Sequence, residues 1–210
     1  MLVKKSVRYI SILASTFFFL TACSSQAKPD AKEAVTQYFT ENYEVDSTKA
    51  FSRMYLADVT HDGAEEMIVV NQGYITKGED RTLGAGSVDV LFQNEEGDVT
   101  KIWTYPIHHA ESTFLYLTKI EGEQYLLQYF PTESQGICTY HYNVFSLNNK
   151  GEAVVLKEAE ADTWKSDSMT VEELRTQAEG FWQQAEADLN QPYVLVEQGS
   201  KIPAICTINE

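Results

Sequence analysis

Basic residues are scarce in this chain. Its 210 residues include 16 Lys and Arg against 31 Asp and Glu, which gives a formal net charge of −15 at pH 7. Nucleic-acid binding needs a basic patch that neutralises phosphates, and electrostatic docking on an anionic lipid surface also needs basic residues. The composition therefore argues against a nucleic-acid partner and against a membrane contact that is held by charge.

Signatures of common catalytic chemistries are also missing. The chain contains no nucleophile elbow, no phosphate-binding loop and no zinc-ligand spacing, and the segment 84–86, GAG, is too short to cradle a phosphate. His108 and His109 are adjacent, so on a strand they would point to opposite faces and could not bind one ion. The sequence therefore gives no catalytic residue, and a non-enzymatic protein is the better hypothesis.

Hydrophobic runs long enough to span a membrane are absent from the sequence. The longest hydrophobic run lies at the start. Residues 10–22, ISILASTFFFLTA, follow a basic segment with Lys4, Lys5 and Arg8. This run is shorter than the roughly 20 apolar residues that a membrane-spanning helix needs. A basic start, a short apolar core and small residues before a cleavage point are typical of an export signal. We therefore predict a signal peptide over residues 1–22.

The end of this leader reads Leu20-Thr21-Ala22-Cys23, which resembles the lipobox of bacterial lipoproteins. In that family the Cys thiol receives a diacylglyceryl group with palmitate-like chains, and a peptidase cleaves before it. The resemblance implies a lipidated Cys23, a short tether over residues 23–30 and an exported protein. Its place would be the outer face of the cytoplasmic membrane, or the outer membrane in a Gram-negative host. The alternative is an ordinary secretory signal.

Processing at Cys23 would have two consequences for the mature chain. The leader carries three basic residues and no acidic one, so its loss takes the formal charge from −15 to −18. Lipidation would use the thiol of Cys23 and so leave Cys138 and Cys206 as the remaining cysteines. An even pair outside the cytoplasm can form a disulfide, and two buried thiols explain the sequence equally well.

Residues 31–210 are predicted to form one extracytoplasmic domain, because this length suffices for a hydrophobic core. Apolar spacing predicts helices at 30–43 and 170–189, and Thr170 with Glu173 forms a capping-box pattern. Between the helices the period is two, and linkers with Gly beside Asn, Asp or Glu favour hairpins. The predicted strands are 54–59, 67–70, 87–92, 99–107, 113–119, 124–130, 138–147, 152–158 and, after the second helix, 193–199.

The predicted fold class is therefore α+β. It consists mainly of antiparallel hairpins in a meander, with a partial propeller-like sheet as one option, an N-terminal helix and a C-terminal helix. Residues 73–87, GYITKGEDRTLGAGS, are rich in glycine and charge. We expect them to form a long surface loop.

The most informative motif lies in residues 55–70, YLADVTHDGAEEMIVV, where acids stand between two predicted strands. Alternating oxygen-bearing side chains suit a loop around a hard cation, and calcium takes six to eight oxygen ligands at about 2.3–2.6 Å. An EF-hand is excluded, because its twelfth position would be Val69. The candidate metal ligands are Asp58, Thr60, Asp62, the carbonyl of Ala64, and Glu66.

The spacing resembles the calcium loop of FG-GAP and VCBS repeats in integrin-like β-propellers, where Asp-x-Asp-x-Asp-Gly-x-x-Asp precedes an apolar strand. The resemblance implies that Asp58, Asp62 and Glu66 are carboxylate ligands of a structural Ca²⁺ ion. Thr60 stands where the family has an acid, and Glu66 replaces a shorter acid. The alternative is a plain Asp62-Gly63 hairpin turn with solvated acids.

Three functions remain open from the sequence. The first is a membrane-anchored binding or interaction module for a protein, peptide or glycan, with its aromatic residues lining a groove or filling the core. The second is a cell-envelope hydrolase that acts on glycan or peptide with the acids of this loop. The third is an accessory lipoprotein of a transporter.

Overall fold

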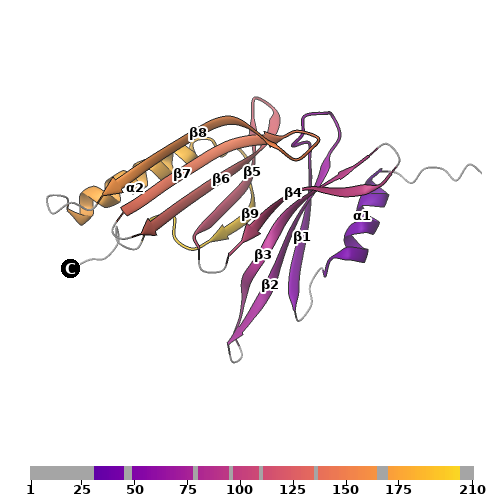
Figure 1. The fold of residues 1–210 in the computed structure, drawn as a ribbon, viewed down its shortest axis with the longest axis horizontal. Helices are drawn as coiled ribbons and strands as arrows, with labels where there is room; N and C mark the ends of the chain where they lie inside the picture. The colour runs from indigo at the N-terminus through magenta and orange to yellow at the C-terminus, as the bar shows by residue number, and fades with distance from the viewer. Residues whose placement is uncertain are drawn as a thin grey trace, which may run out of the picture.

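A computed structural model describes residues 31–44, 49–77, 80–94, 97–108, 111–134, 137–164 and 170–203. These residues form two antiparallel sheets and two helices (Figure 1). The elements in chain order are α1 (Ala31–Asn42), β1 (Ala50–Ala57), β2 (Glu66–Lys77), β3 (Asp80–Gln93), β4 (Val99–Ile107), β5 (Thr113–Ile120), β6 (Glu123–Ser134), β7 (Ile137–Leu147), β8 (Ala153–Trp164), α2 (Val171–Glu186) and β9 (Tyr193–Gln198).

Sheet A is a meander with the strand order β1-β2-β3-β4. The prediction of a long surface loop over residues 73–87 is wrong, because β2 and β3 stay paired as far as Lys77 and Asp80, with one irregularity between Gln72 and Tyr74. Backbone hydrogen bonds hold this pairing whatever the side chains are. Gly86 permits it sterically, since a Cβ there would lie 2.0 Å from the carbonyl oxygen of Asn71.

Sheet B has the order β8-β7-β6-β5-β9. Strands β5 to β8 pair in sequence through short turns, as the hairpin linkers predict. Strand β9 returns after α2 and pairs with β5, with Thr113 opposite Gln198. Strands β8 and β9 are therefore the two edges of sheet B.

Helix α2 begins at the predicted capping box. The backbone N–H of Glu173 donates to the Thr170 hydroxyl (3.2 Å), and the Glu173 carboxylate accepts from the backbone N–H of Thr170 (2.8 Å). The apolar positions at spacings of three and four point to one face of sheet B. The buried residues of the helix are Leu174, Ala178, Phe181 and Ala185, and they share a cluster with Tyr129, Tyr140 and Tyr142.

The two sheets pack against each other through one hydrophobic cluster. It includes Ile68, Val70 and Val90 of sheet A together with Leu115, Leu126, Phe145 and Leu195 of sheet B. Helix α1 covers the other face of sheet A, where Val35 and Phe39 contact Met67, Val69 and Leu91. Each sheet thus has one face in a shared core and another face under a helix.

The α+β class with mainly antiparallel strands is confirmed, and a propeller is not shown by these two sheets. Within the described ranges, no helix has the length and apolar character needed to cross a membrane.

Cys23 and the leader lie outside the described residues. Cys138 is buried on β7, whereas Cys206 lies outside the described part of the chain, so the disulfide between them stays a prediction.

Candidate metal centre

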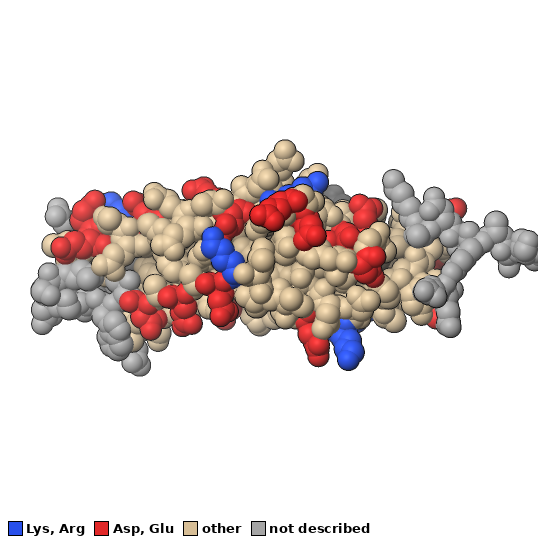
Figure 2. Space-filling model, turned by 90° about the horizontal axis from the view of Figure 1, so that it is seen from above, with Lys and Arg blue, Asp and Glu red and all other residues tan. Residues whose placement is uncertain are grey.

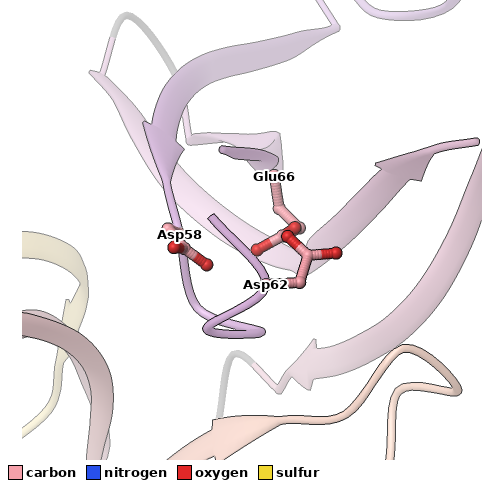
Figure 3. Close-up of side chains that lie close together, drawn as sticks. All are labelled: Asp58, Asp62 and Glu66. Atoms are coloured by element: carbon pink, nitrogen blue, oxygen red, sulfur yellow. The ribbon is translucent and has the colours of Figure 1, made fainter. Parts of the chain in front are cut away.

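The segment 58–65 joins β1 to β2 at one end of sheet A. It brings together three of the five predicted ligands. Asp58, Asp62 and Glu66 each offer a carboxylate oxygen, and these oxygens lie within 4.8 Å of one another (Figure 3). Asp62 is exposed, Asp58 is partly buried and Glu66 is buried. The geometry is that of an open-sided site with a buried floor.

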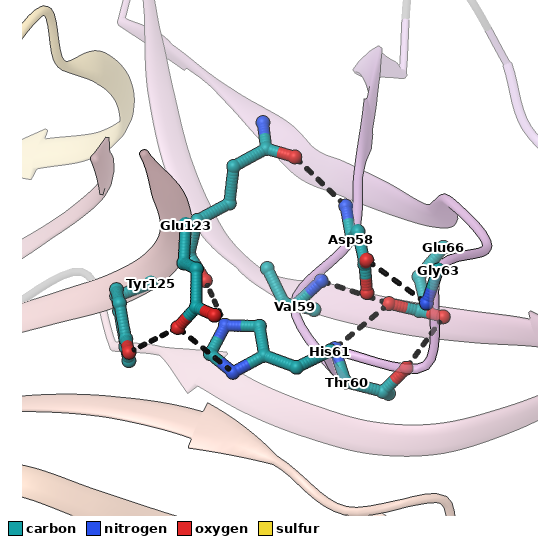
Figure 4. A network of polar contacts seen from close by, with 9 residues as sticks. Asp58, Val59, Thr60, His61, Gly63, Glu66, Glu123 and Tyr125 are labelled. Carbon is teal, nitrogen blue, oxygen red and sulfur yellow. Dashed lines mark hydrogen bonds and ion pairs between the residues drawn. The ribbon is translucent and has the colours of Figure 1, made fainter. Parts of the chain in front are cut away.

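Glu66 forms this floor and organises the loop around it. One carboxylate oxygen, Oε2, accepts from the backbone N–H groups of Val59 (2.9 Å) and Thr60 (3.0 Å), and Oε1 accepts from the Thr60 hydroxyl (3.0 Å) (Figure 4). A carboxylate has about four acceptor positions. Three of these positions are occupied in Glu66, so one remains for a cation. The hydroxyl of Thr60, a predicted metal ligand, donates its hydrogen bond to Glu66.

The two aspartates shape the opposite side of the loop. Asp58 Oδ2 accepts from the backbone N–H of Gly63 (3.1 Å), and Asp62 Oδ1 accepts from the backbone N–H of Ala64 (2.9 Å). Gly63 has a φ of 89°, a conformation that glycine adopts without steric penalty. These bonds fold the loop so that the carboxylates of Asp58 and Asp62 come close to that of Glu66. The carbonyl of Ala64 stays a predicted ligand.

One oxygen in this group is buried without a partner. Asp58 Oδ1 has no hydrogen-bond donor and almost no solvent contact. A buried, unsatisfied acceptor costs about 1–3 kcal/mol, and more when it is charged. A cation between the three carboxylates would satisfy this oxygen and reduce the repulsion between like charges. The residues present therefore fit a hard cation with oxygen ligands.

The loop also connects the two sheets. The backbone N–H of Asp58 donates to the side chain of Gln124 (2.9 Å), and His61 Nε2 donates to the carbonyl of Gln124 (2.8 Å). The His61 ring meets the Tyr125 ring edge-on at 4.7 Å, and the carbonyl of Val59 accepts from the backbone N–H of Leu147 (2.8 Å). The loop of sheet A is thus fastened to β6 and β7 of sheet B.

Sequence reasoning missed the contribution of His61 and Gln124. They are 63 positions apart, and no local pattern connects them. His61 occupies one of the intervening positions of the motif, which the calcium-loop spacing leaves undefined. Its φ of 59° and its contact with Gln124 become visible only when the second sheet is in place.

Burial raises the pKa of Glu66, and the nearby Asp62 charge acts in the same direction, although the hydrogen bonds from Thr60 and Val59 oppose them. Calcium binds the ionised carboxylate, so a raised pKa makes protonation compete with calcium at higher pH. If the loop binds calcium, the rise in melting temperature that calcium causes should shrink as the pH falls toward the raised pKa of Glu66, beginning above the ordinary value of 4.5.

In the calcium-free protein, the effect of Glu66 on stability should change with pH in the opposite direction. Its folded state binds the Glu66 proton more tightly than the unfolded state does, so this residue's contribution to stability rises as the pH falls through the raised pKa. Melting curves of calcium-stripped and calcium-loaded protein across a pH series measure both effects. A calcium shift that is constant down to pH about 4 would contradict the involvement of Glu66.

Comparison of the chain with models of protein families, with curated proteins and with solved structures finds no match.

Proposed function

We propose that this protein is a lipid-anchored, extracytoplasmic binding module, without catalytic activity, in which a calcium ion bound by the loop 58–66 fastens sheet A to sheet B. The observation that supports this most is the convergence of the carboxylates of Asp58, Asp62 and Glu66, together with the buried, unpartnered oxygen that one of them, Asp58, carries. The same loop carries the hydrogen bonds to Gln124. An ion there would hold the loop in the shape that makes these bonds.

Asp58, Asp62 and Glu66 would hold the ion through carboxylate oxygens, with the Ala64 carbonyl and waters completing the shell. The ion supplies positive charge that offsets three neighbouring carboxylates. A structural role is favoured over hydrolysis, because a catalytic acid pair should face a cleft. Two cavities are described, one of about 630 Å³ beside Tyr74 and His108 and one of about 550 Å³ beside Tyr43 and Asp89, and no residue of the loop lines either cavity.

The proposal includes a relation to the repeat family that the loop resembles. Sheet A is a four-stranded antiparallel meander with the acidic loop between its first two strands. A propeller blade is also a four-stranded antiparallel sheet. Sheet A would then correspond to one blade-like unit, stabilised by sheet B in place of further blades.

The anchor would set the orientation of the molecule. Helix α1 and helix α2 lie toward opposite ends of the molecule (Figure 1). A tether over residues 23–30 spans at most about 25 Å, so a lipid on Cys23 would keep the α1 end close to the bilayer. Sheet B and α2 would then be presented away from the membrane, where a partner can reach them.

Calcium should stabilise the wild-type protein measurably. At a calcium concentration about ten times Kd, binding to the folded state alone adds about 1.4 kcal/mol to the free energy of unfolding. For a domain of this size that raises the melting temperature by roughly 3–6 °C. Magnesium should have a smaller effect, because it prefers a tight octahedron and retains its waters. Thermal unfolding in chelator and in millimolar calcium provides the measurement.

The double substitution Asp58→Asn with Asp62→Asn tests whether the stabilisation by calcium depends on these two carboxylates. It keeps the size of both side chains and leaves the hydrogen bonds of Glu66 intact, so we expect a folded protein without a calcium shift. A wild-type melting curve that is identical in chelator and in calcium would show that the loop is a polar turn.

Lipidation at Cys23 should be lost completely in Cys23→Ser. Only a thiol at the position after Ala22 can accept the diacylglyceryl group, so metabolic labelling with a fatty-acid analogue should mark the wild type and leave the variant unlabelled. Cys138→Ser is the control and should keep the label. Equal labelling of Cys23→Ser and wild type would contradict the anchor and leave the calcium argument unaffected.

A further inference from the structure

The outer edge of sheet B is unusually long. Strand β8 runs from Ala153 to Trp164, and in the described part of the chain it pairs with β7 alone. An edge strand presents unpaired N–H and C=O groups to any additional strand, and proteins usually protect such edges with proline, lysine, bulges or short length. The far edge, β9, is only six residues long. Its carbonyls at Leu195 and Val194 accept hydrogen bonds from Arg53 and Tyr55.

Strand β8 has few of these protections. It contains no proline, and its one lysine, Lys157, is paired with Asp188 at 2.6 Å. The register with β7 shifts at Leu156 and is then regular from Lys157 to Trp164. The strand therefore offers a regularly paired run of backbone groups after the bulge and an exposed apolar segment around the bulge. Val154, Val155 and Leu156 of this segment are 52%, 47% and 52% exposed.

The regular part of β8 carries acids on one face. Glu158, Glu160 and Asp162 alternate along the strand and lie opposite Asn143, His141 and Thr139 of β7. All three acids are exposed, and they lie on the face of sheet B away from α2. On the side of the molecule seen in Figure 2, which includes the β8 edge at the top of Figure 1, acidic side chains predominate over basic ones. A neighbouring strand with basic residues on this face would place them beside these carboxylates.

The other face of the regular part of β8 carries Lys157, which is paired with Asp188, followed by two alanines. Ala159 and Ala161 are partly buried there and pack against the cluster that β7 forms with α2. An added strand would place every second side chain next to these alanines, at the border of that cluster. The edge thus distinguishes two sets of positions in a partner strand, one that favours positive charge and one that favours apolar residues.

From these four observations we infer that the edge of β8 binds an extended cationic peptide segment, with alternating basic and apolar residues, as an additional strand of sheet B. A second copy of this chain is disfavoured as the occupant, because each copy is strongly acidic, with a formal charge of −15 for the full sequence, and would bring its own acidic row to the edge. The inference rests on the binding role proposed above and specifies its partner.

The test uses the lipidated protein in zwitterionic phosphatidylcholine nanodiscs, which do not attract cationic peptides. The probe is a fluorescent peptide of about ten residues in which Lys and Val alternate. One comparison peptide has the same composition with Lys and Val in separate blocks. Another has the alternating sequence with N-methylated backbone groups, which keep the charge and cannot donate to a ladder. We expect the alternating peptide to bind most tightly and to slow hydrogen exchange in residues 157–163.

The double variant Glu158→Lys with Glu160→Lys should weaken binding about tenfold or more, because like charges would then face each other across the new pair. The matched variant Glu179→Lys with Glu186→Lys changes the net charge equally on the exposed face of α2 and should weaken binding by about twofold at most, since salt screens distant charges. Melting curves establish that both variants are folded.

Several outcomes would overturn the inference. These are equal binding of the three peptides, equal loss in the two charge variants, unchanged exchange in β8, or a dimer through β8 in sedimentation experiments. The calcium shift is measured on the same samples. Lost peptide binding with an intact calcium shift rejects the β8 inference alone, and an absent calcium shift with intact peptide binding rejects the metal site alone.

Discussion

Replacing Glu66 with alanine is expected to lower the free energy of unfolding by about 3 kcal/mol in the presence of a chelator. The substitution removes the acceptor for the backbone N–H groups of Val59 and Thr60 and for the Thr60 hydroxyl. Val59 is fully buried, so water cannot replace that partner without opening the loop. The relief of a buried charge with a raised pKa offsets only part of this loss.

Urea unfolding followed by circular dichroism measures this effect, and Glu65→Ala is its control. Glu65 is the adjacent acid and is exposed, so its replacement should change stability by no more than about 0.5 kcal/mol. Similar stabilities for Glu66→Ala and Glu65→Ala would show that the carboxylate does not organise the loop. The comparison also separates Glu66, which holds the loop together without metal, from Asp58 and Asp62, whose effect should depend on calcium.

Gly151→Ala is expected to cause the largest loss of stability, about 4 kcal/mol. Gly151 lies in the turn between β7 and β8 with a φ of 78°, and a Cβ there would lie 1.7 Å from the carbonyl oxygen of Ile102 in β4. The turn of sheet B thus rests on the backbone of sheet A, and neither backbone can move without disturbing the packing between the sheets.

Gly122→Ala provides the matched control for this prediction. Gly122 lies in the turn between β5 and β6 with a φ of 96°, and no atom lies within 4 Å of a Cβ built there. Its replacement should therefore cause only the backbone strain of a left-handed residue, about 1–2 kcal/mol. The denaturant midpoints of Gly151→Ala and Gly122→Ala, compared where their m-values are equal, measure the two losses of stability. Equal losses would mean that the contact with Ile102 is not tight.

Local chemistry allowed much of this fold to be predicted. The capping box at Thr170, the period-two strands and the glycine-containing turns all depend on neighbouring residues, and the structure has them at the predicted places. The failure at residues 73–87 has a different origin. There the side chains suggest a loop, while cross-strand backbone bonds and the close approach at Gly86 hold a hairpin.

In the candidate site, too, the features that depend on neighbouring residues could be predicted, and those that depend on distant residues could not. Spacing alone identified Asp58, Asp62 and Glu66 as residues that converge. Spacing could not show that Glu66 is buried and already accepts three hydrogen bonds, because burial depends on sheet B covering the loop. The contact between His61 and Gln124 was beyond prediction for the same reason.

The pairing of β9 with β5 in sheet B affects the order in which the two sheets can form during folding. Strands β1 to β4 and β5 to β8 pair with their neighbours in sequence, so each group can form as soon as its own residues are available. Strand β9 differs from them, because its partner β5 is distant in the sequence and it also accepts a hydrogen bond from Arg53 in β1. A chain that ends before residue 193 would leave the edge of β5 open and the Arg53 guanidinium without this acceptor. Strand β9, which comes last among the strands of the described residues, therefore contacts both sheets, and chains that are terminated before residue 193 should be more open to proteolysis.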